Sequence, residues 1–260
     1  MPAFTYTARG VTSESPTVVF VSALFAGGWI WDHPLEHLAA RGLGVLALDQ
    51  PVCEVDSTIA GSIEKLGDEV IACCDEAGAG RIVVCANSLG GLVALDLAMR
   101  HPDRVVALAI SGAPGLTPDP DVGLGMDRRT GNTPRGPEFE ERMLAALFHR
   151  GRHFTDEQLR ECGELLARPS SMVSMARSLR ATRKYPIRDA LAAVTCPSRM
   201  IWGRHDRMTP VDSWSEATAG LDHFQMEIIE DCGHIPMLEK AEQYTSSLTD
   251  FLDHEVGVRA

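Results

Sequence analysis

The sequence predicts an α/β fold in which helices flank a mostly parallel sheet. Short apolar runs rich in β-branched residues alternate with segments of helical period along most of the chain. One such run, residues 82–85, passes through a glycine-containing turn at Ser88 directly into a helical segment. The alternation stops after Gly112 and resumes near Ile187. Ligands of such a fold are expected at the carboxyl ends of the strands.

The first part of the chain carries five predicted strands, at residues 4–8, 17–23, 45–48, 82–85 and 104–111. Apolar periodicity and glycine stops predict helices at residues 31–41, 58–77 and 89–100. The last part predicts helices at 187–194, 211–219 and 241–254, with strands at 198–202 and 226–229. We therefore expect a two-part core, residues 1–114 and 186–260.

An insertion is predicted between the two parts of the core, at residues 115–185. Residues 114–137 are dense in Pro, Gly and Asp and predict an excursion loop. Helices are expected at 137–150, 155–168 and 169–184, and Thr155 with Gln158 predicts a capping box. We expect this segment to form a helical cap over the edge of the sheet where ligands bind.

The amino-acid composition limits the classes of function that this protein can have. The 260 residues are 45% hydrophobic and 23% charged, with a formal net charge of -12, which argues against a nucleic-acid partner. Seven cysteines without a CxxC pair predict small buried side chains in a reducing compartment. We see no signal peptide and no apolar run of about 18 residues. The expected protein is cytoplasmic, a monomer or homodimer, without a membrane partner.

The turn at Ser88 predicts a nucleophile. A serine lifted out of a sheet in this way needs strained backbone angles and small neighbours, and Ala86 and Gly90 stand two residues before and after it. A phosphate-binding loop would need a GxxxxGK[ST] or GxGxxG pattern, and the turn has neither.

A serine nucleophile needs a base and an acid that orients the base. Asp206 follows one predicted strand and His234 follows another, and the order Ser88, Asp206, His234 is the one expected on such a sheet. We predict these three residues as a catalytic triad. His205 is interpreted as a bystander, and the remaining histidines as solvated groups in or at the ends of helices. No metal site and no cofactor are predicted.

Negative charge that develops on a substrate oxygen needs fixed donors. One predicted donor is the backbone amide of Leu89, which follows the serine. The second is expected from the first loop, at Leu24, with Gly27 and Gly28 allowing a close approach. The alternative for this loop is an ordinary turn between strand and helix.

The chain resembles the α/β-hydrolases over nearly its whole length. The motifs that carry the resemblance are ANSLGG around Ser88, WGRHDRMTP around Asp206 and DCGHIPMLEK around His234. The resemblance implies an α/β-hydrolase sheet with a helical cap and the roles of nucleophile, acid and base for the three residues. The family usually has His-Gly where this chain has Ser22-Ala23.

Two branches of the family share features with this chain. The first loop, SALFAGGWIWD, is similar to that of small-ester esterases and hydroxynitrile lyases, although the lyases have a lysine where this chain has Ile235. Asn87 and the WGR-x-DR run are similar to hydrolases of carbon–carbon bonds in meta-cleavage products, which tend to have an aromatic residue at the position of Ile235.

Charge and loop position suggest residues that contact substrate. The segment 115–185 holds 12 basic and 10 acidic residues, whereas the remainder of the chain holds 12 and 26. Arg180 and Arg183 share a helical face and would suit a substrate carboxylate, although solvated helix charges explain them as well. Phe25 and Asn87, which flank the predicted donor and nucleophile, are the other predicted substrate contacts.

The sequence thus predicts an enzyme, a serine hydrolase that cleaves a small ester or similar carbonyl substrate through an acyl-enzyme. The alternatives are hydrolysis of a carbon–carbon bond in a vinylogous keto acid, and a non-hydrolytic cyclase or ligand-binding protein with the same fold. The expected partner is a small molecule, with a carboxylate among the possibilities.

Overall fold

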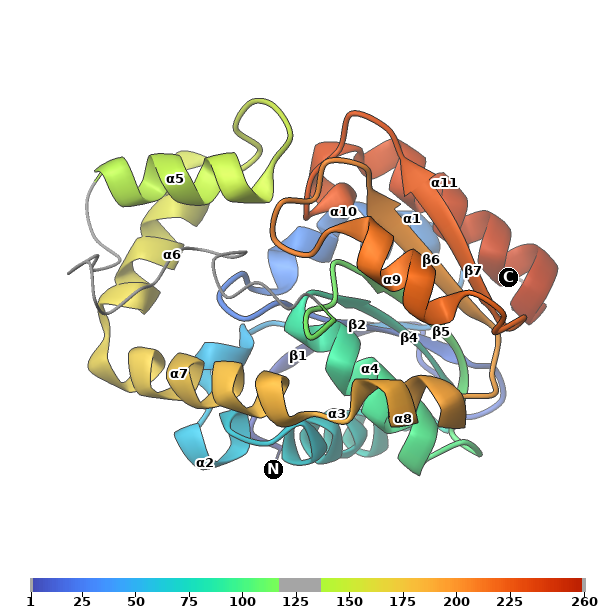
Figure 1. Cartoon of the computed structure of the whole chain (residues 1–260). Helices are drawn as coiled ribbons and strands as arrows, with labels where there is room; N and C mark the ends of the chain where they lie inside the picture. The colour runs from blue at the N-terminus through green and yellow to red at the C-terminus, as the bar shows by residue number, and fades with distance from the viewer. Residues whose placement is uncertain (1, 117–136, 259–260) are drawn as a thin grey trace.

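The computed structural model describes residues 2–116 and 137–258 (Figure 1). A seven-stranded sheet has the order β1-β3-β2-β4-β5-β6-β7, and β1 alone of these strands runs antiparallel to its neighbour. The strands are β1 Tyr6–Arg9, β2 Thr17–Val21, β3 Val45–Leu48, β4 Ile82–Asn87, β5 Val105–Ser111, β6 Ser198–Gly203 and β7 Phe224–Ile229. The predicted mostly parallel α/β sheet is confirmed.

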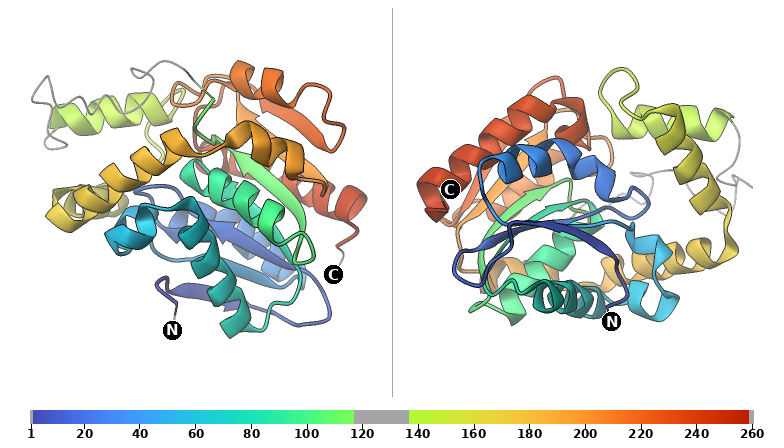
Figure 2. Two further views of the ribbon diagram at one scale, coloured as in Figure 1. Left: turned by 60° about the horizontal axis from the view of Figure 1, so that its bottom comes forward. Right: turned by 180° about the vertical axis from the view of Figure 1, so that it is seen from behind.

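Helices cover both faces of the sheet (Figure 2). One face carries α1 Asp32–Ala40 and α11 Ala241–Phe251, and the other carries α3 Ile63–Ala77, α4 Leu89–Arg100 and α8 Ile187–Ala193. The strand β4 is buried at every residue because β2 and β5 pair with both of its edges and helices cover it. A strand buried on both faces reads as a continuous apolar run, which explains why residues 82–85 stood out in the sequence.

Several boundaries differ from the prediction. The helix predicted at 58–77 is two helices, α2 Ser57–Ala60 and α3, because the Ser62 hydroxyl accepts a hydrogen bond from the Lys65 amide and begins a new helix. The last helix ends at Phe251 and continues as a π-helical turn, Leu252–Val256. The helix α9 Val211–Thr218 was predicted at 211–219. The short helix α10 Pro236–Glu239 was not predicted. Two 3-10 turns, Gly28–Trp31 and Val52–Glu54, complete the first half.

In the described part of the chain between β5 and β6, three helices precede α8: α5 Pro137–Leu147, α6 Asp156–Ala167 and α7 Pro169–Lys184. The predicted capping box is present, because the Thr155 hydroxyl accepts from the Gln158 amide and the Gln158 side chain accepts from the Thr155 amide. The predicted loop at 114–137 lies almost entirely outside the described residues. The division into a core and a cap stays a prediction.

A face of small side chains on α7 packs against the chain after β3. The hydroxyl of Ser174 donates to the Val55 carbonyl at 2.8 Å, and that of Ser178 donates to the Ala60 carbonyl at 2.7 Å. Both serines are buried, so their hydroxyls find partners in the neighbouring backbone. Within the described ranges, no helix is both long enough and apolar enough to cross a lipid bilayer.

Candidate active site

Ser88 occupies a strained turn between β4 and α4. Its backbone angles are φ 54° and ψ -127°, and it is one of two non-glycine residues with positive φ in the described chain. Its amide donates to the Ser111 carbonyl at 2.9 Å. A Cβ atom at Gly90 would lie 2.7 Å from the Val21 carbonyl oxygen, so the start of α4 passes too close to β2 for any larger residue. The small residue predicted after the serine is thus required by packing.

Asp206 and His234 meet at the carboxyl ends of β6 and β7. The distance from His234 Nδ1 to Asp206 Oδ2 is 2.9 Å, and both residues are buried. Gly203, the last residue of β6, makes the approach possible, because a Cβ there would lie 2.6 Å from the Cys232 carbonyl oxygen. The two loops therefore pack directly against each other.

Donors surround the carboxylate of Asp206. Its Oδ1 accepts hydrogen bonds from the amides of Met208 and Thr209, each at 2.8 Å. Its Oδ2 accepts from the Thr209 hydroxyl at 2.7 Å as well as facing His234. These bonds occupy both carboxylate oxygens and fix the carboxylate plane. Sequence reasoning missed Thr209, although an Asp followed three residues later by Thr is a usual local hydrogen-bonding pattern.

The imidazole of His234 lies against Gly112, at the carboxyl end of β5. A Cβ at Gly112, the residue after β5, would lie 2.7 Å from His234 Cε1, so the ring packs directly on this backbone. The side-chain nitrogen Nδ2 of Asn87 donates to the backbone carbonyl of His234 at 3.1 Å and to that of Ser111 at 3.3 Å. Four strand ends thus bring the three predicted triad residues to one edge of the sheet.

Asn87, whose role as a substrate contact stays a prediction, lies beneath the loop of His234. It is completely buried, and its amide nitrogen is used by two backbone carbonyls. Its position on β4 directs the side chain under the loop of His234, where it supports that loop. Its Oδ1 has no hydrogen-bond partner within the part of the chain that the structure describes.

The first loop packs against the 3-10 turn at Val52–Glu54. The carbonyls of Ala23 and Leu24 accept from the amides of Val52 and Cys53, at 3.2 Å and 2.9 Å. Leu89 is the first residue of α4, and the first amides of a helix have no partner within it. The backbone donors at Leu24 and Leu89 stay a prediction.

The other predicted contact of the first loop, Phe25, is buried beneath α6. Its carbonyl accepts from the Cys162 thiol at 3.6 Å. Phe25 and Trp29 also line a small hollow that Leu165 and Arg168 close from the side of α6 and its end. This part of the loop therefore lies under the helical segment that follows β5.

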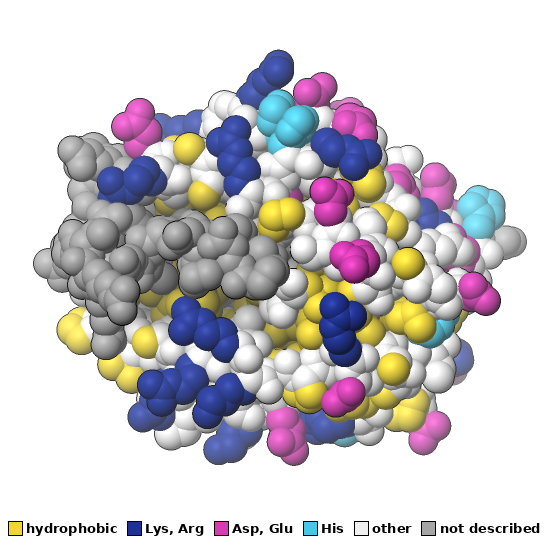
Figure 3. Space-filling model, viewed as in Figure 1, with side chains coloured by type: hydrophobic (Ala, Val, Ile, Leu, Met, Phe, Trp, Pro, Cys, Tyr) yellow, Lys and Arg dark blue, Asp and Glu magenta, His cyan; other side chains and the backbone are white. Residues whose placement is uncertain are grey.

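Arg180 and Arg183 are exposed on α7. The buried face of α7 is formed by other residues, among them Ser174, Met175 and Ser178. Figure 3 shows the Lys and Arg side chains over α7 on the outer surface of the molecule. Helical period places these arginines away from the packed face of α7, and their contact with a substrate carboxylate stays a prediction.

A carboxylate outside the predicted site ties the loop of His234 to the end of α5. Glu239 Oε1 accepts from the amides of His149 and Arg150 at 2.9 Å and 3.1 Å, and its Oε2 accepts from the Gly233 amide at 2.6 Å. The His234 amide donates to the Leu147 carbonyl at 2.7 Å. No sequence signal links Glu239 to residues about ninety positions away, so this clamp was not predicted.

One of the remaining histidines departs from the solvated state expected for it. The side chain of His149 is 12% exposed, and its ring stacks on that of His205 with 3.8 Å between ring centroids. His205 is exposed, and its backbone amide donates to the Cys232 carbonyl at 2.8 Å.

Comparisons with known proteins match this architecture. A family model described as "Alpha/beta hydrolase family" matches residues 18–246. A 2-hydroxy-6-oxononadienedioate/2-hydroxy-6-oxononatrienedioate hydrolase of Cupriavidus pinatubonensis is 30% identical over 94% of this chain and 88% of that protein. One of the same name from Paraburkholderia xenovorans is 27% identical over 96% and 90%.

Among solved structures, a membrane phospholipase A, titled a novel bacterial virulence factor, superposes with a TM-score of 0.79. It is 25% identical, over 95% of this chain and 81% of that one. The family match, the sheet order and the strained serine turn agree along nearly the whole length of the sequence. This chain belongs to the alpha/beta hydrolase family and is an enzyme, a hydrolase.

Proposed function

We propose that the enzyme hydrolyses a carbon–carbon bond in a small vinylogous keto acid. The observation that carries this proposal is the 30% identity, over 94% of this chain, to a hydrolase named for a hydroxy-oxo-nonadienedioate. From the sequence, ester hydrolysis was our leading expectation and carbon–carbon bond hydrolysis was the alternative. We now prefer the alternative. The substrate in that name is a dicarboxylate, which agrees with the small, carboxylate-bearing partner among those expected.

The proposed chemistry assigns one role to each residue of the triad. Ser88 attacks the ketone carbonyl, and His234 takes the proton of its hydroxyl while Asp206 holds the imidazole through Nδ1. The cleavage needs the keto tautomer of the substrate, in which the 2-hydroxyl proton has moved to the carbon beside the attacked ketone. The carbon–carbon bond then breaks, its electron pair enters the conjugated 2-oxo acid as a dienolate, and the dienolate oxygen takes up the proton held by His234. Water hydrolyses the remaining acyl-enzyme and restores Ser88.

Electrostatic preorganisation supports the assignment of Asp206 and His234. Four hydrogen bonds fix the carboxylate of Asp206, and burial keeps water from competing for them. An oriented carboxylate stabilises the imidazolium that forms when His234 takes a proton. The amides of Leu89 and Leu24 are the proposed donors to the oxyanion, each worth about 3–4 kcal/mol in such sites.

Hydrolysis of a small ester is the second candidate. Ester hydrolysis needs the same nucleophile, base and donors. Its substrate needs only a carbonyl group that carries a leaving group. The observation in its favour is Ile235, a buried aliphatic residue where the carbon–carbon hydrolases tend to have an aromatic one. Its substrate would not need the conjugated acid.

A substrate panel separates these candidates. We expect 2-hydroxy-6-oxononadienedioate to be turned over with a higher kcat/KM than any p-nitrophenyl ester of short or medium acyl chain. Ser88→Ala should lower kcat by at least about 10³-fold, as removal of a serine nucleophile does elsewhere. The loss of the dienedioate's absorbance and the release of p-nitrophenol measure the two activities.

The same panel identifies the alternatives. Serine-dependent turnover of esters without turnover of the dienedioate would establish the ester hydrolase. Absence of both activities, together with no labelling of Ser88 by a fluorophosphonate, would favour a cyclase or a ligand-binding protein.

A further inference from the structure

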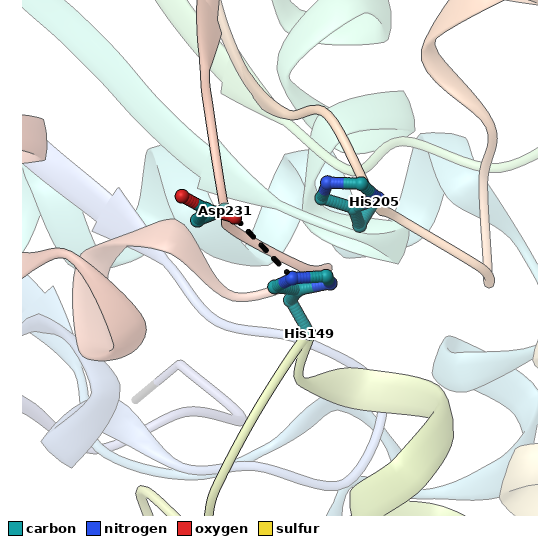
Figure 4. A group of neighbouring side chains, drawn as sticks. All are labelled: His149, His205 and Asp231. Carbon is teal, nitrogen blue, oxygen red and sulfur yellow. Dashed lines mark ion pairs between the residues drawn. The ribbon is translucent and has the colours of Figure 1, made fainter.

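We propose that His149, His205 and Asp231 form a binding site for a divalent transition-metal ion of the zinc class. The three residues come from different segments: the chain after α5, the loop after β6 and the loop after β7. Figure 4 shows the two imidazoles and the carboxylate gathered where these segments meet. The site is separate from the triad and does not depend on the proposed reaction.

The distances bring the donor atoms to one place. One candidate donor atom from each residue lies within 4.8 Å of the other two. His149 Nε2 and Asp231 Oδ1 are 3.5 Å apart. Two imidazole nitrogens and a carboxylate oxygen are a usual donor set for Zn²⁺, with water in the fourth position. A magnesium ion prefers oxygen donors and is not expected here.

His149 provides the observation that points to a ligand. Both of its ring nitrogens are buried and have no hydrogen-bond partner among residues 2–116 and 137–258, and its side chain is 12% exposed. Buried polar atoms of folded proteins are nearly always hydrogen-bonded, and an unpaired one costs about 1–3 kcal/mol. A metal ion shared by His149 and Asp231 would satisfy a ring nitrogen whose contact with the Asp231 carboxylate, at 3.5 Å, is longer than a usual hydrogen bond.

Binding requires one small rearrangement. The rings of His149 and His205 are 18° from parallel and stacked, so their in-plane lone pairs do not converge on one point. His205 is exposed, so a rotation about its side-chain bonds can direct a nitrogen toward His149 and Asp231. His149 is held in place by the packing around it, and its amide is bound by Glu239.

An ion at this site would join the end of α5 to the two loops that carry Asp206 and His234. His205 precedes Asp206 directly, and Asp231 lies three residues before His234. A ligand that binds the folded state alone stabilises it. The expected consequence is a more stable protein in which these three segments are crosslinked.

Thermal unfolding with and without metal tests the site. We expect ZnCl₂ to raise Tm by about 5–10 °C when the free ion is about 100 times Kd, whereas MgCl₂ leaves Tm unchanged. Isothermal titration with Zn²⁺ should give one site, and Co²⁺ should develop visible absorption bands when it enters the same site. These measurements need no substrate, so their failure leaves the proposed reaction untouched.

Two variants assign the binding to these residues. Asp231→Asn suits the test because Asp231 has φ 50°, a conformation that Asn tolerates. His205→Gln removes an exposed ligand with little effect on packing. Each should weaken Zn²⁺ binding by at least about tenfold, since even partners of metal ligands contribute that much. His37→Gln, on the exposed surface of α1, is the matched control and should bind as the wild type does.

Three results would overturn the proposal. The first is an equal response to Zn²⁺ in the wild type, Asp231→Asn and His205→Gln. The second is a response to Mg²⁺ as large as the response to Zn²⁺. The third is a loss of Zn²⁺ binding in His37→Gln as large as the loss in the other two variants.

Discussion

Ser88 holds a backbone conformation that costs a non-glycine residue about 1–3 kcal/mol. The surroundings enforce it: the Ser88 amide donates to the Ser111 carbonyl, and Gly90 lets α4 begin against β2. At the scale of single residues, then, the site consists of a strained serine and a histidine whose carboxylate partner is fixed by local bonds. Strain of this kind persists only where the fold overdetermines it.

Thr209 is expected to act as a positioning residue for Asp206. Thr209→Val removes the 2.7 Å hydrogen bond to Oδ2, and a hydrogen bond to a charged group contributes about 1.5–3 kcal/mol. We expect kcat to fall by about 10- to 100-fold with KM little changed. Steady-state kinetics on the best substrate of the panel measures the effect.

Two variants control for packing. Thr209→Ser should restore most of kcat because it returns the hydroxyl. Thr218→Val removes a buried hydroxyl that donates within α9, to the Trp214 carbonyl, and should leave kcat unchanged. Equal losses in Thr209→Val and Thr218→Val would contradict the positioning role.

At the scale of elements, the ends of α5 and α10 hold the loop of His234. Glu239, the last residue of α10, accepts hydrogen bonds from three backbone amides, and the Leu147 carbonyl accepts from the His234 amide. The described chain at the end of α5 thus contacts the loop of His234 through its backbone, at Leu147, His149 and Arg150.

Glu239→Gln tests this clamp. A Gln side chain keeps one acceptor oxygen but presents an NH₂ group to an amide donor, so one or two charge-assisted bonds are lost. We expect the free energy of unfolding to fall by about 1–3 kcal/mol. The expected fall in Tm is about 2–10 °C, and kcat should fall with it.

Glu242→Gln, at an exposed position on α11, is the matched control for the loss of one negative charge. It should change Tm by less than about 1 °C, since surface substitutions have small effects. A Glu239→Gln variant with the stability and kcat of the wild type would show that the clamp has no role.

At the scale of the whole molecule, the exposure of the cysteines shows how closely the interior is packed. Six of the seven are buried, and Cys196 is partly exposed. Burial raises the pKa of the Cys53 thiol to about 12, and that of Cys74 likewise to about 12. The thiolate is the reactive form, so these groups are almost entirely unreactive at neutral pH.

A thiol titration checks this prediction. In the native protein at pH 7.5 to 8, conditions usual for such reagents, we expect an aromatic disulfide reagent to modify one thiol at most, Cys196. Denaturant should expose all seven cysteines. Cys196→Ser should abolish the native reaction, and rapid modification of two or more thiols in the native protein would contradict the prediction.

Much of the architecture was readable in the chain itself. The helix after Ser88 was predicted at 89–100 and found at Leu89–Arg100, because its apolar period and its flanking turn are local signals. Asp206 and His234 were placed by motif and strand order, and the structure brings them within a hydrogen bond of each other.

Contacts between distant segments could not be read in the same way. The bonds of Glu239 to His149 and Gly233, the burial of Asn87 and the outward position of Arg180 all depend on how separate elements pack. Helical period predicts which residues share a face of α7, but it does not say which face meets the rest of the protein.

The sequence by itself determined the alternation of strands and helices, the strained serine and the chain order of the predicted triad, since short-range sterics and hydrophobic period depend on neighbouring residues. The tertiary structure alone decided which side chains meet across loops: the support of Asp206 by Thr209, the clamp at Glu239 and the gathering of His149, His205 and Asp231. Such meetings arise when packing closes long loops, and no local pattern in the chain encodes them.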